Sequence, residues 1–400
     1  MINSSTTTIR NDTDGEMKPM PVAVAYDPYE SFLAKRIFSV LAISSILLSC
    51  IAWTARQTLN GGNAAFMSNL RKVTTYSLAD MGQAPLFNPE EPDPWKSELF
   101  ARLDRIREAC GPLCSINDAE SLEEHTKAKG PYFRILEVPV DCDSIMLNED
   151  IDAEDATVPY PIPDELVPFF GMNGLVDVHM EQQLMETTIH QSKITWTEQY
   201  VELLKKRAKS PMEEIASPFH WTYRFRMAVE KKVPVNGKRV LVMGGEDPWI
   251  EAILLHLGAR HVVTLAPGAG IVSEHPQIST MTVAEMRTLY REGQLEQFDA
   301  VMSFSTVEHL GLGRYEDALN PWADIIATAR ARCMTKKGGF MAIALPTGKD
   351  NVLFNKERKY GQVRYPLLGA NWIQTNGDEE LLNHRDQGLA YHPTFIFHNL

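Results

Sequence analysis

Basic residues are too few in this chain to suit a nucleic-acid partner. The sequence has 39 Lys and Arg against 52 Asp and Glu, a formal net charge of -13 at pH 7. No basic stripe interrupts this acidic balance. Because binding to a phosphate backbone depends on clustered positive charge, we expect no nucleic-acid partner.

Long apolar runs are also scarce, and only residues 37–53 form one, with 17 uncharged residues. That length is the lower limit for a membrane-spanning helix. A cleaved signal peptide would begin nearer the first residue, and a buried core helix would carry one polar face. A signal-anchor helix therefore fits best, with a disordered cytosolic tail before it. Lys35 and Arg36 favour that orientation, whereas Arg56 weakens it.

Cysteine is rare as well, with five in the chain. Cys50 lies in the apolar run, which leaves Cys110, Cys114, Cys142 and Cys333. Four thiols suit two disulfides in an oxidising lumen, and they suit free reduced thiols equally well. Three residues separate Cys110 from Cys114, so this spacing is not that of the redox pair, which has two.

The nicotinamide fingerprint G-x-G-x-x-G is absent, but a different βαβ unit covers residues 240–265. A short apolar run predicts a buried strand, and Gly244 with Gly245 predicts a sharp turn. Asp247 and Pro248 suit the N-cap and first position of a helix, which Gly258 would end. Such a unit binds ligands at the carboxyl end of its first strand.

The alternation of strand and helix patterns predicts an α/β fold with a Rossmann-like, doubly wound, mostly parallel sheet. Helices are expected at 94–110, 194–209, 220–232, 283–291 and 322–334, and further strands at 132–140, 299–304 and 340–345. The acidic stretch 148–155 lacks the glycine and closing glutamate of a calcium loop, which predicts a solvated loop.

Glu308 and His309 directly follow the strand at 299–304, at the sheet edge that also carries the glycine turn. A carboxylate beside an imidazole can act as acid and base near neutral pH. The pair can equally well form a local cap and fill a polar pocket. Ser305 stands where a magnesium-binding Glu-x-x-Glu-His pattern has its first glutamate, so we expect no metal.

Polar loops should line the same crevice. Gly311 and Gly313 precede Arg314 and Tyr315, and a second loop after the strand at 340–345 carries Asn355, Arg358, Tyr360 and Arg364. Arg314, Tyr315 and Arg364 are the residues that we expect to bind substrate, since arginine suits anionic groups. A polar small molecule or a glycan is the expected substrate.

These motifs resemble the Caenorhabditis-type family of unknown function, number 268 in the unknown-function series. The chain is also distantly similar to class I S-adenosylmethionine-dependent methyltransferases. The residues that carry both resemblances lie at 242–251, 298–315, 320–322, 337–340 and 344–348. The resemblance covers roughly residues 160–400.

The resemblance implies a Rossmann-like fold and methyl transfer from S-adenosylmethionine. The cofactor would contact Gly244, Gly245, Asp247 and Ser303, with Glu308 and His309 as the catalytic pair near the methyl group. The sequence departs from the methyltransferase pattern at Val242, Glu246, Pro248 and Ala266. These departures favour the alternative of a catalytically inactive binding or scaffolding protein of the secretory membranes.

Four regions follow from these observations. We expect a disordered cytosolic tail at 1–36, a single transmembrane signal-anchor helix at 37–53, a small mixed α/β stem and accessory region at 54–159, and a methyltransferase-like Rossmann domain at 160–400. The lipid bilayer would be one partner. The expected place is the membrane of the endoplasmic reticulum or Golgi, with the C-terminal domain lumenal. This anchor-and-stem layout is the sole support for a third alternative, a nucleotide-sugar enzyme.

Overall fold

The computed structural model describes residues 94–129, 134–153, 162–180, 194–209, 220–266, 270–315, 317–375 and 392–400. The predicted tail, the signal-anchor helix at 37–53 and the stem up to residue 93 lie outside these residues. None of the helices in the described ranges combines the length and apolarity that crossing a bilayer requires. Residues 92–400 form one compact unit.

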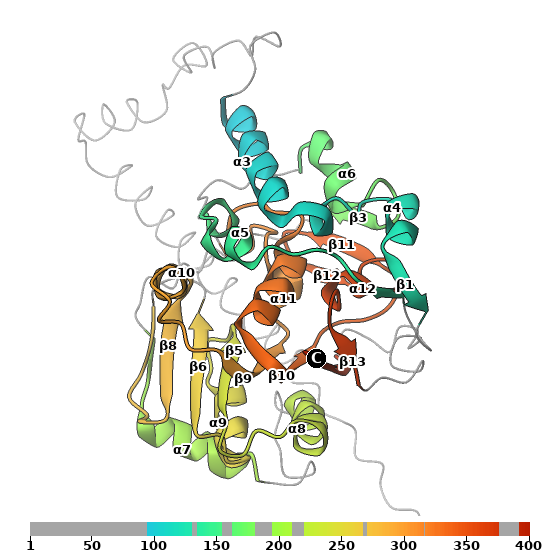
Figure 1. The fold of residues 1–400 in the computed structure, drawn as a ribbon. Coiled ribbons are helices and arrows are strands. Elements are labelled where there is room, and N and C mark those ends of the chain that lie inside the picture. Colours follow the sequence, from blue (N-terminus) through green and yellow to red (C-terminus); the bar gives the residue numbers. More distant parts are fainter. Residues whose placement is uncertain are drawn as a thin grey trace, which may run out of the picture. The chain divides into compact units, whose positions relative to one another are not determined.

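A seven-stranded sheet organises this unit, with the strand order β13-β14-β10-β9-β5-β6-β8. Its strands are β5 (Arg239–Met243), β6 (His261–Ala266), β8 (Ile278–Thr282), β9 (Phe298–Phe304), β10 (Thr335–Ala344), β13 (Ile373–Gln374) and β14 (Thr394–His398). The strands from β10 to β8 are parallel, and β14 pairs antiparallel with both β10 and β13. The α/β, Rossmann-like prediction is confirmed, and Figure 1 shows the strands between helices.

Side chains of β5 alternate between two apolar cores, one on each face of the sheet, because successive strand residues point to opposite sides. Leu241 and Met243 join one core, and Val240 and Val242 join the other. The first core is shared with α3 (Pro94–Cys110), α5 (Cys142–Leu147), α10 (Val283–Arg291) and α11 (Ala323–Met334). The second is shared with α7 (Glu198–Arg207), α8 (His220–Lys232) and α9 (Trp249–His256). The sheet is therefore covered on both faces, as a parallel sheet requires.

Smaller elements surround this sheet. The strand β11 (Asn351–Phe354) pairs with β12 (Glu357–Lys359) and with β3 (Asp177–Met180), while β4 (Ile194–Trp196) pairs with β7 (Ile271–Ser273), and β1 (Thr126–Lys129) with β2 (Arg134–Leu136). The remaining helices are α4 (Ala119–Glu124), α6 (Val167–Phe170), α12 (Tyr365–Leu368) and the short 3-10 turns η1 (Gly111–Cys114), η2 (Asp150–Asp152), η3 (Asp164–Leu166) and η5 (Val307–His309).

Two disulfides are present, so the interpretation of reduced thiols is wrong. Cys110 bonds Cys114 at the end of α3, and Cys142 bonds Cys333 across 191 residues of sequence. The second bond joins α5 to α11 and thereby ties the N-terminal helices to the helix that packs on β10.

Two local predictions need correction. The expected helix at 194–209 starts only at Glu198, because Ile194 to Trp196 pair in parallel with β7, a partner that local sequence does not reveal. The described part of the acidic stretch, residues 148–153, is not a solvated loop. Asp150 pairs with Arg105, and Asp152 accepts hydrogen bonds from Arg287 at 2.7 Å and Arg330 at 2.9 Å.

Candidate functional site

The strand order reverses at β5, and open α/β sheets commonly bind ligands in a crevice at the carboxyl end of such a strand. The chain leaves β5 through α9 into β6 on one side, while β9 lies on the other side. Met243 at the end of β5 pairs with Ser303 near the end of β9. The prediction that the glycine turn and the His309 segment share one sheet edge is therefore confirmed.

The glycine turn touches the His309 segment directly. Gly244 and Gly245 have φ values of 87° and 107°, a region that favours glycine. A Cβ on Gly244 would lie 2.3 Å from Cγ2 of Thr306, whereas one on Gly245 would meet no atom of the described residues closer than 3.6 Å. Gly244 is thus fixed by packing, and the exposed Gly245 backbone is the part that a ligand can approach.

The loop after the turn is held from the side of α7. The indole N–H of Trp196 donates to the carbonyl oxygen of Glu246 at 2.7 Å, and the Tyr200 hydroxyl donates to Oδ1 of Asp247 at 3.0 Å. The prediction that Asp247 caps α9 is wrong, because Pro248 occupies the N-cap position and makes no side-chain cap bond. The expected C-terminal stop at Gly258, with φ 88°, is confirmed.

Glu308 is completely buried beneath the crevice. Its Oε1 accepts a hydrogen bond from the Ser305 hydroxyl at 2.7 Å, and its Oε2 has no hydrogen-bond partner among the described residues. Burial raises the pKa of Glu308 to about 7, against a smaller opposite effect of the Ser305 bond. Glu308 therefore exchanges its proton near neutral pH. Ser305 holds its hydroxyl there with a φ of 49°, an unusual backbone conformation that is common at functional sites.

His309 has a defined tautomer. Its Nδ1 lies 2.6 Å from the carbonyl oxygen of Lys356. A carbonyl can only accept, so Nδ1 carries the proton and Nε2 keeps its lone pair. That Nε2 lies 3.8 Å from Oε1 of Glu308. Burial, and then the charges of Arg314 and His392, lower the pKa of His309 to about 4, against the Lys356 bond, so the imidazole is neutral at pH 7.

Arg314 and Tyr315 lie on the solvent side of His309. Tyr315 is 56% exposed as a residue, and its ring meets the His309 ring edge to face, with centroids 5.9 Å apart. The Arg314 guanidinium lies 5.3 Å from the Tyr315 ring centroid and donates to the same Lys356 carbonyl at 3.3 Å. An exposed aromatic face, an arginine and an imidazole nitrogen thus adjoin one another.

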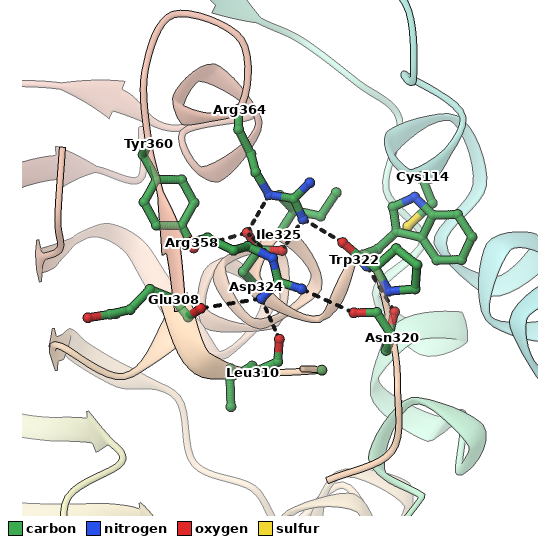
Figure 2. Close-up of polar contacts among 12 residues, drawn as sticks. Cys114, Glu308, Leu310, Asn320, Trp322, Asp324, Ile325, Arg358, Tyr360 and Arg364 are labelled. Atoms are coloured by element: carbon green, nitrogen blue, oxygen red, sulfur yellow. Dashed lines mark hydrogen bonds and ion pairs between the residues drawn. The ribbon is translucent and has the colours of Figure 1, made fainter. Parts of the chain in front are cut away.

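Arg364 lies elsewhere than expected. It is buried and donates from Nε and Nη2 to the two carboxylate oxygens of Asp324, at 2.8 and 2.7 Å. Figure 2 shows this ion pair together with Arg358 and Tyr360, which were also expected along the crevice and are also buried. Polar residues in a loop sequence do not show whether a buried carboxylate pairs with them. Here Asp324 is that carboxylate, and its ion pairs keep these side chains in the core.

Two further residues belong to this edge of the sheet. Ser303 is buried on β9, and its Oγ has no hydrogen-bond partner among the described residues. His392 was not predicted from the sequence. Its ring meets that of Phe304 with centroids 6.0 Å apart, and burial lowers its pKa to about 4. The buried pattern of residues 394–398 was the available signal, since an antiparallel strand there starts beside the carboxyl end of β10.

The chain has an α/β fold in which helices cover both faces of a mainly parallel seven-stranded sheet. Residues 237–388 match the model of a family described as "Caenorhabditis protein of unknown function, DUF268". This match confirms the resemblance that the sequence motifs indicated. No curated protein shows a significant match to the chain.

Comparison with solved structures finds partial similarity to several methyltransferases, at TM-scores of 0.28 to 0.32. A 1,6-didemethyltoxoflavin-N1-methyltransferase from Burkholderia thailandensis, solved with S-adenosylhomocysteine, has 14% identity and a TM-score of 0.32, with 50% of this chain and 89% of that one covered. The N-methyltransferase NodS from Bradyrhizobium japonicum, also with S-adenosylhomocysteine, has 11% identity, a TM-score of 0.28, and coverage of 50% and 97%. A putative methyltransferase from Streptococcus mutans has 10% identity and a TM-score of 0.30; 45% of this chain aligns with it and spans about half of its length (49%).

Proposed function

We propose that this protein is a membrane-anchored methyltransferase that transfers a methyl group from S-adenosylmethionine to a hydroxyl of a polar small molecule or glycan. The observation that carries the proposal is the contact between the Gly244–Gly245 turn and the Ser305–His309 segment at the reversal point of the sheet. This juxtaposition puts a bare backbone and a neutral imidazole at one crevice, where open α/β sheets bind ligands.

The residues at the crevice fit the cofactor on the side of the turn. Gly245 leaves its backbone open, and the first N–H groups of α9 follow it. Ser303 offers a buried hydroxyl without a partner among the described residues. On the ribose side the fit is poorer, because β6 ends in Ala266 instead of a carboxylate. S-adenosylmethionine, when bound, would supply an electrophilic methyl group.

His309 would act as the general base. With its proton fixed on Nδ1 by the Lys356 carbonyl, Nε2 is free to accept the proton of an acceptor hydroxyl. Glu308, 3.8 Å from Nε2, would stabilise the resulting imidazolium as a carboxylate. Its pKa of about 7 makes that charged form accessible at neutral pH.

Tyr315 and Arg314 would hold the acceptor. The exposed Tyr315 ring suits the apolar face of a sugar, and the adjacent guanidinium suits an anionic substituent. The alignment of the bound acceptor with the methyl group of S-adenosylmethionine and with His309 would supply most of the rate enhancement.

The lumen of the endoplasmic reticulum or Golgi is the proposed compartment, with the signal-anchor helix at 37–53 in the bilayer. Two disulfides support it, because such bonds persist in oxidising compartments.

A non-catalytic binding or scaffolding role is the second candidate. It is favoured by the Thr306 side chain, which fills the space above Gly244, and by the lack of a carboxylate at the end of β6. This candidate predicts no cofactor affinity.

Calorimetric titration of the full chain with S-adenosylmethionine and S-adenosylhomocysteine separates the two candidates. We expect binding that Gly245→Leu abolishes. Gly293→Leu is the matched control, because Gly293 also has a positive φ, of 66°, and a Cβ there would lie more than 4 Å from the part of the chain that the structure describes. No heat at millimolar cofactor, or equal loss in both variants, would refute the proposal.

A further inference from the structure

The turn between β11 and β12 holds the candidate base. The carbonyl oxygen of Lys356 in this turn accepts hydrogen bonds from Nδ1 of His309, at 2.6 Å, and from Nη1 of Arg314, at 3.3 Å. Its neighbour Asn355 has a φ of 60°, so the turn itself adopts an uncommon conformation. Both residues of the crevice that face the acceptor therefore depend on where this turn lies.

Arg358, two residues after Lys356, contacts the backbone that follows His309. It is fully buried, and Nη1 donates to the carbonyl oxygen of Leu310, with a longer contact of 3.5 Å to that of Glu308. Its Nη2 donates to the carbonyl oxygen of Asn320 at 3.3 Å. One guanidinium thus holds both ends of the segment between Glu308 and Asn320 (Figure 2).

Asp324 fixes the position of this guanidinium. Its Oδ2 lies 3.7 Å from Nε of Arg358 and also accepts hydrogen bonds from Arg364, at 2.8 Å, and Tyr360, at 3.0 Å. Burial alone would raise the pKa of Asp324, but the charges of Arg358 and Arg364 lower it below its ordinary value. Asp324 is therefore an anion at neutral pH and balances the buried cations.

Stability alone is a weak reason for such a cluster. Burying charges costs free energy, and apolar residues of the same size are often as stable in their place. A planar guanidinium, in contrast, can hold several carbonyl groups at once in fixed directions. The cluster is better explained by the way it holds the backbone at residues 308–310 and at Asn320.

We infer that Arg358 is a positioning residue, which presents His309 to the crevice as its Nδ1–H tautomer by holding the 308–320 segment against the β11–β12 turn. The role of the presented imidazole as a base rests on the proposed function. The positioning itself does not, so it can be tested without cofactor or acceptor.

Long-range proton–nitrogen NMR spectra of the full chain, with ¹⁵N in the histidine rings, test this inference. His309→Gln identifies the His309 signals among those of the 11 histidines. In the wild type we expect the Nδ1–H tautomer and a titration midpoint of about 4. The opposite tautomer in the wild type would overturn the inference without any variant.

Arg358→Lys supplies the second arm, because an ammonium cannot hold the same set of carbonyls. We expect mixed tautomers, because the hydrogen bond from Nδ1 of His309 to the Lys356 carbonyl would weaken. Tyr360→Phe removes the hydrogen bond to Asp324 and is a milder change in the same network. It should also mix the His309 tautomers, and it serves if Arg358→Lys does not fold. Unchanged His309 signals in the folded variants would overturn the inference.

Arg330→Lys is the matched control. Arg330 is also buried and paired with a carboxylate, but it contacts α5 and Asp152 instead of the 308–320 segment. We expect a lower melting temperature with unchanged His309 signals, and an equal His309 shift in this control would contradict the inference. Titration of the same samples with S-adenosylhomocysteine separates the positioning role of Arg358 from the proposed function. If the NMR result is as expected but the ligand does not bind, only the proposed function is contradicted.

Discussion

Gly244 and Thr306 lie so close together that a Cβ on Gly244 would be 2.3 Å from Cγ2 of Thr306. The two residues come from the ends of neighbouring parallel strands, β5 and β9. Their contact joins the glycine turn to the segment that carries Glu308 and His309. The proposed activity depends on this relationship, because it brings the two halves of the crevice to one place.

Gly244→Ala should therefore destabilise the protein strongly. The positive φ of 87° costs about 1–2 kcal/mol for a residue with a Cβ, and the steric conflict adds to it, for a total of about 2–4 kcal/mol. Thr306→Ala should recover part of this loss in the double variant. Chemical denaturation measures both effects. Gly293→Ala, with free space around it, should lose only the backbone contribution.

His309→Gln should reduce methyl transfer about 10²- to 10⁴-fold, the usual contribution of a general base. Cofactor affinity should stay unchanged, since the imidazole bonds the Lys356 carbonyl and in the proposed function faces the acceptor instead of the cofactor. The assay measures S-adenosylhomocysteine released from S-adenosylmethionine, with a microsomal glycan extract as the acceptor source. His275→Gln is the control, because His275 is buried but bonds Glu202 instead. If His309→Gln and the wild type have equal turnover, His309 is not the general base.

Glu251→Gln should change how stability depends on pH. Burial raises the pKa of Glu251 from 4.5 to about 7, so the folded state binds its proton more tightly than the unfolded state does. Its stabilising contribution is complete below about pH 4.5 and is lost as the pH rises through about 7. The Thr264 hydroxyl donates to Oε1 of Glu251 at 2.6 Å. The glutamine side chain of the variant keeps an oxygen that can accept this hydrogen bond, but it has no proton to lose near neutral pH.

The variant and the wild type should then have similar free energies of unfolding near pH 4.5. At pH 8 the variant should be more stable by up to about 3 kcal/mol. Urea denaturation at the two pH values measures the difference. A wild type that remains the more stable protein at pH 8 would contradict the buried, proton-binding state of Glu251.

The two disulfides should differ in their contributions to stability. Cys142 and Cys333 close a loop of 191 residues, which corresponds to about 5 kcal/mol of chain entropy, whereas Cys110 and Cys114 are only 4 residues apart, about 2 kcal/mol. Replacing each pair by alanine and measuring unfolding under oxidising conditions tests this order. The reverse order would show that local strain or packing dominates.

Short-range patterns were enough to predict much of the fold. The apolar run of β5, the glycine turn and the helix of α9 lie within 20 residues, and each follows from local chemistry. The position of Glu308 and His309 was predictable for a related reason: parallel strands bring their carboxyl ends to one edge.

Long-range pairing explains what could not be predicted. Asp247 bonds Tyr200, 47 residues away, instead of capping its own helix. Arg364 is buried because it pairs with Asp324, which lies 40 residues away in the sequence and is also buried. His392 reaches the crevice only because β14 runs antiparallel to β10. Such partners cannot be predicted from the residues next to each position.

A crystal structure of the full chain with S-adenosylhomocysteine would show whether the glycine turn and the His309 segment form one cofactor site. We expect the ligand over the Gly245 backbone, with its sulfur facing the side of His309. Ligand density at another place, or a crevice that stays closed by Thr306 at saturating concentration, would contradict it.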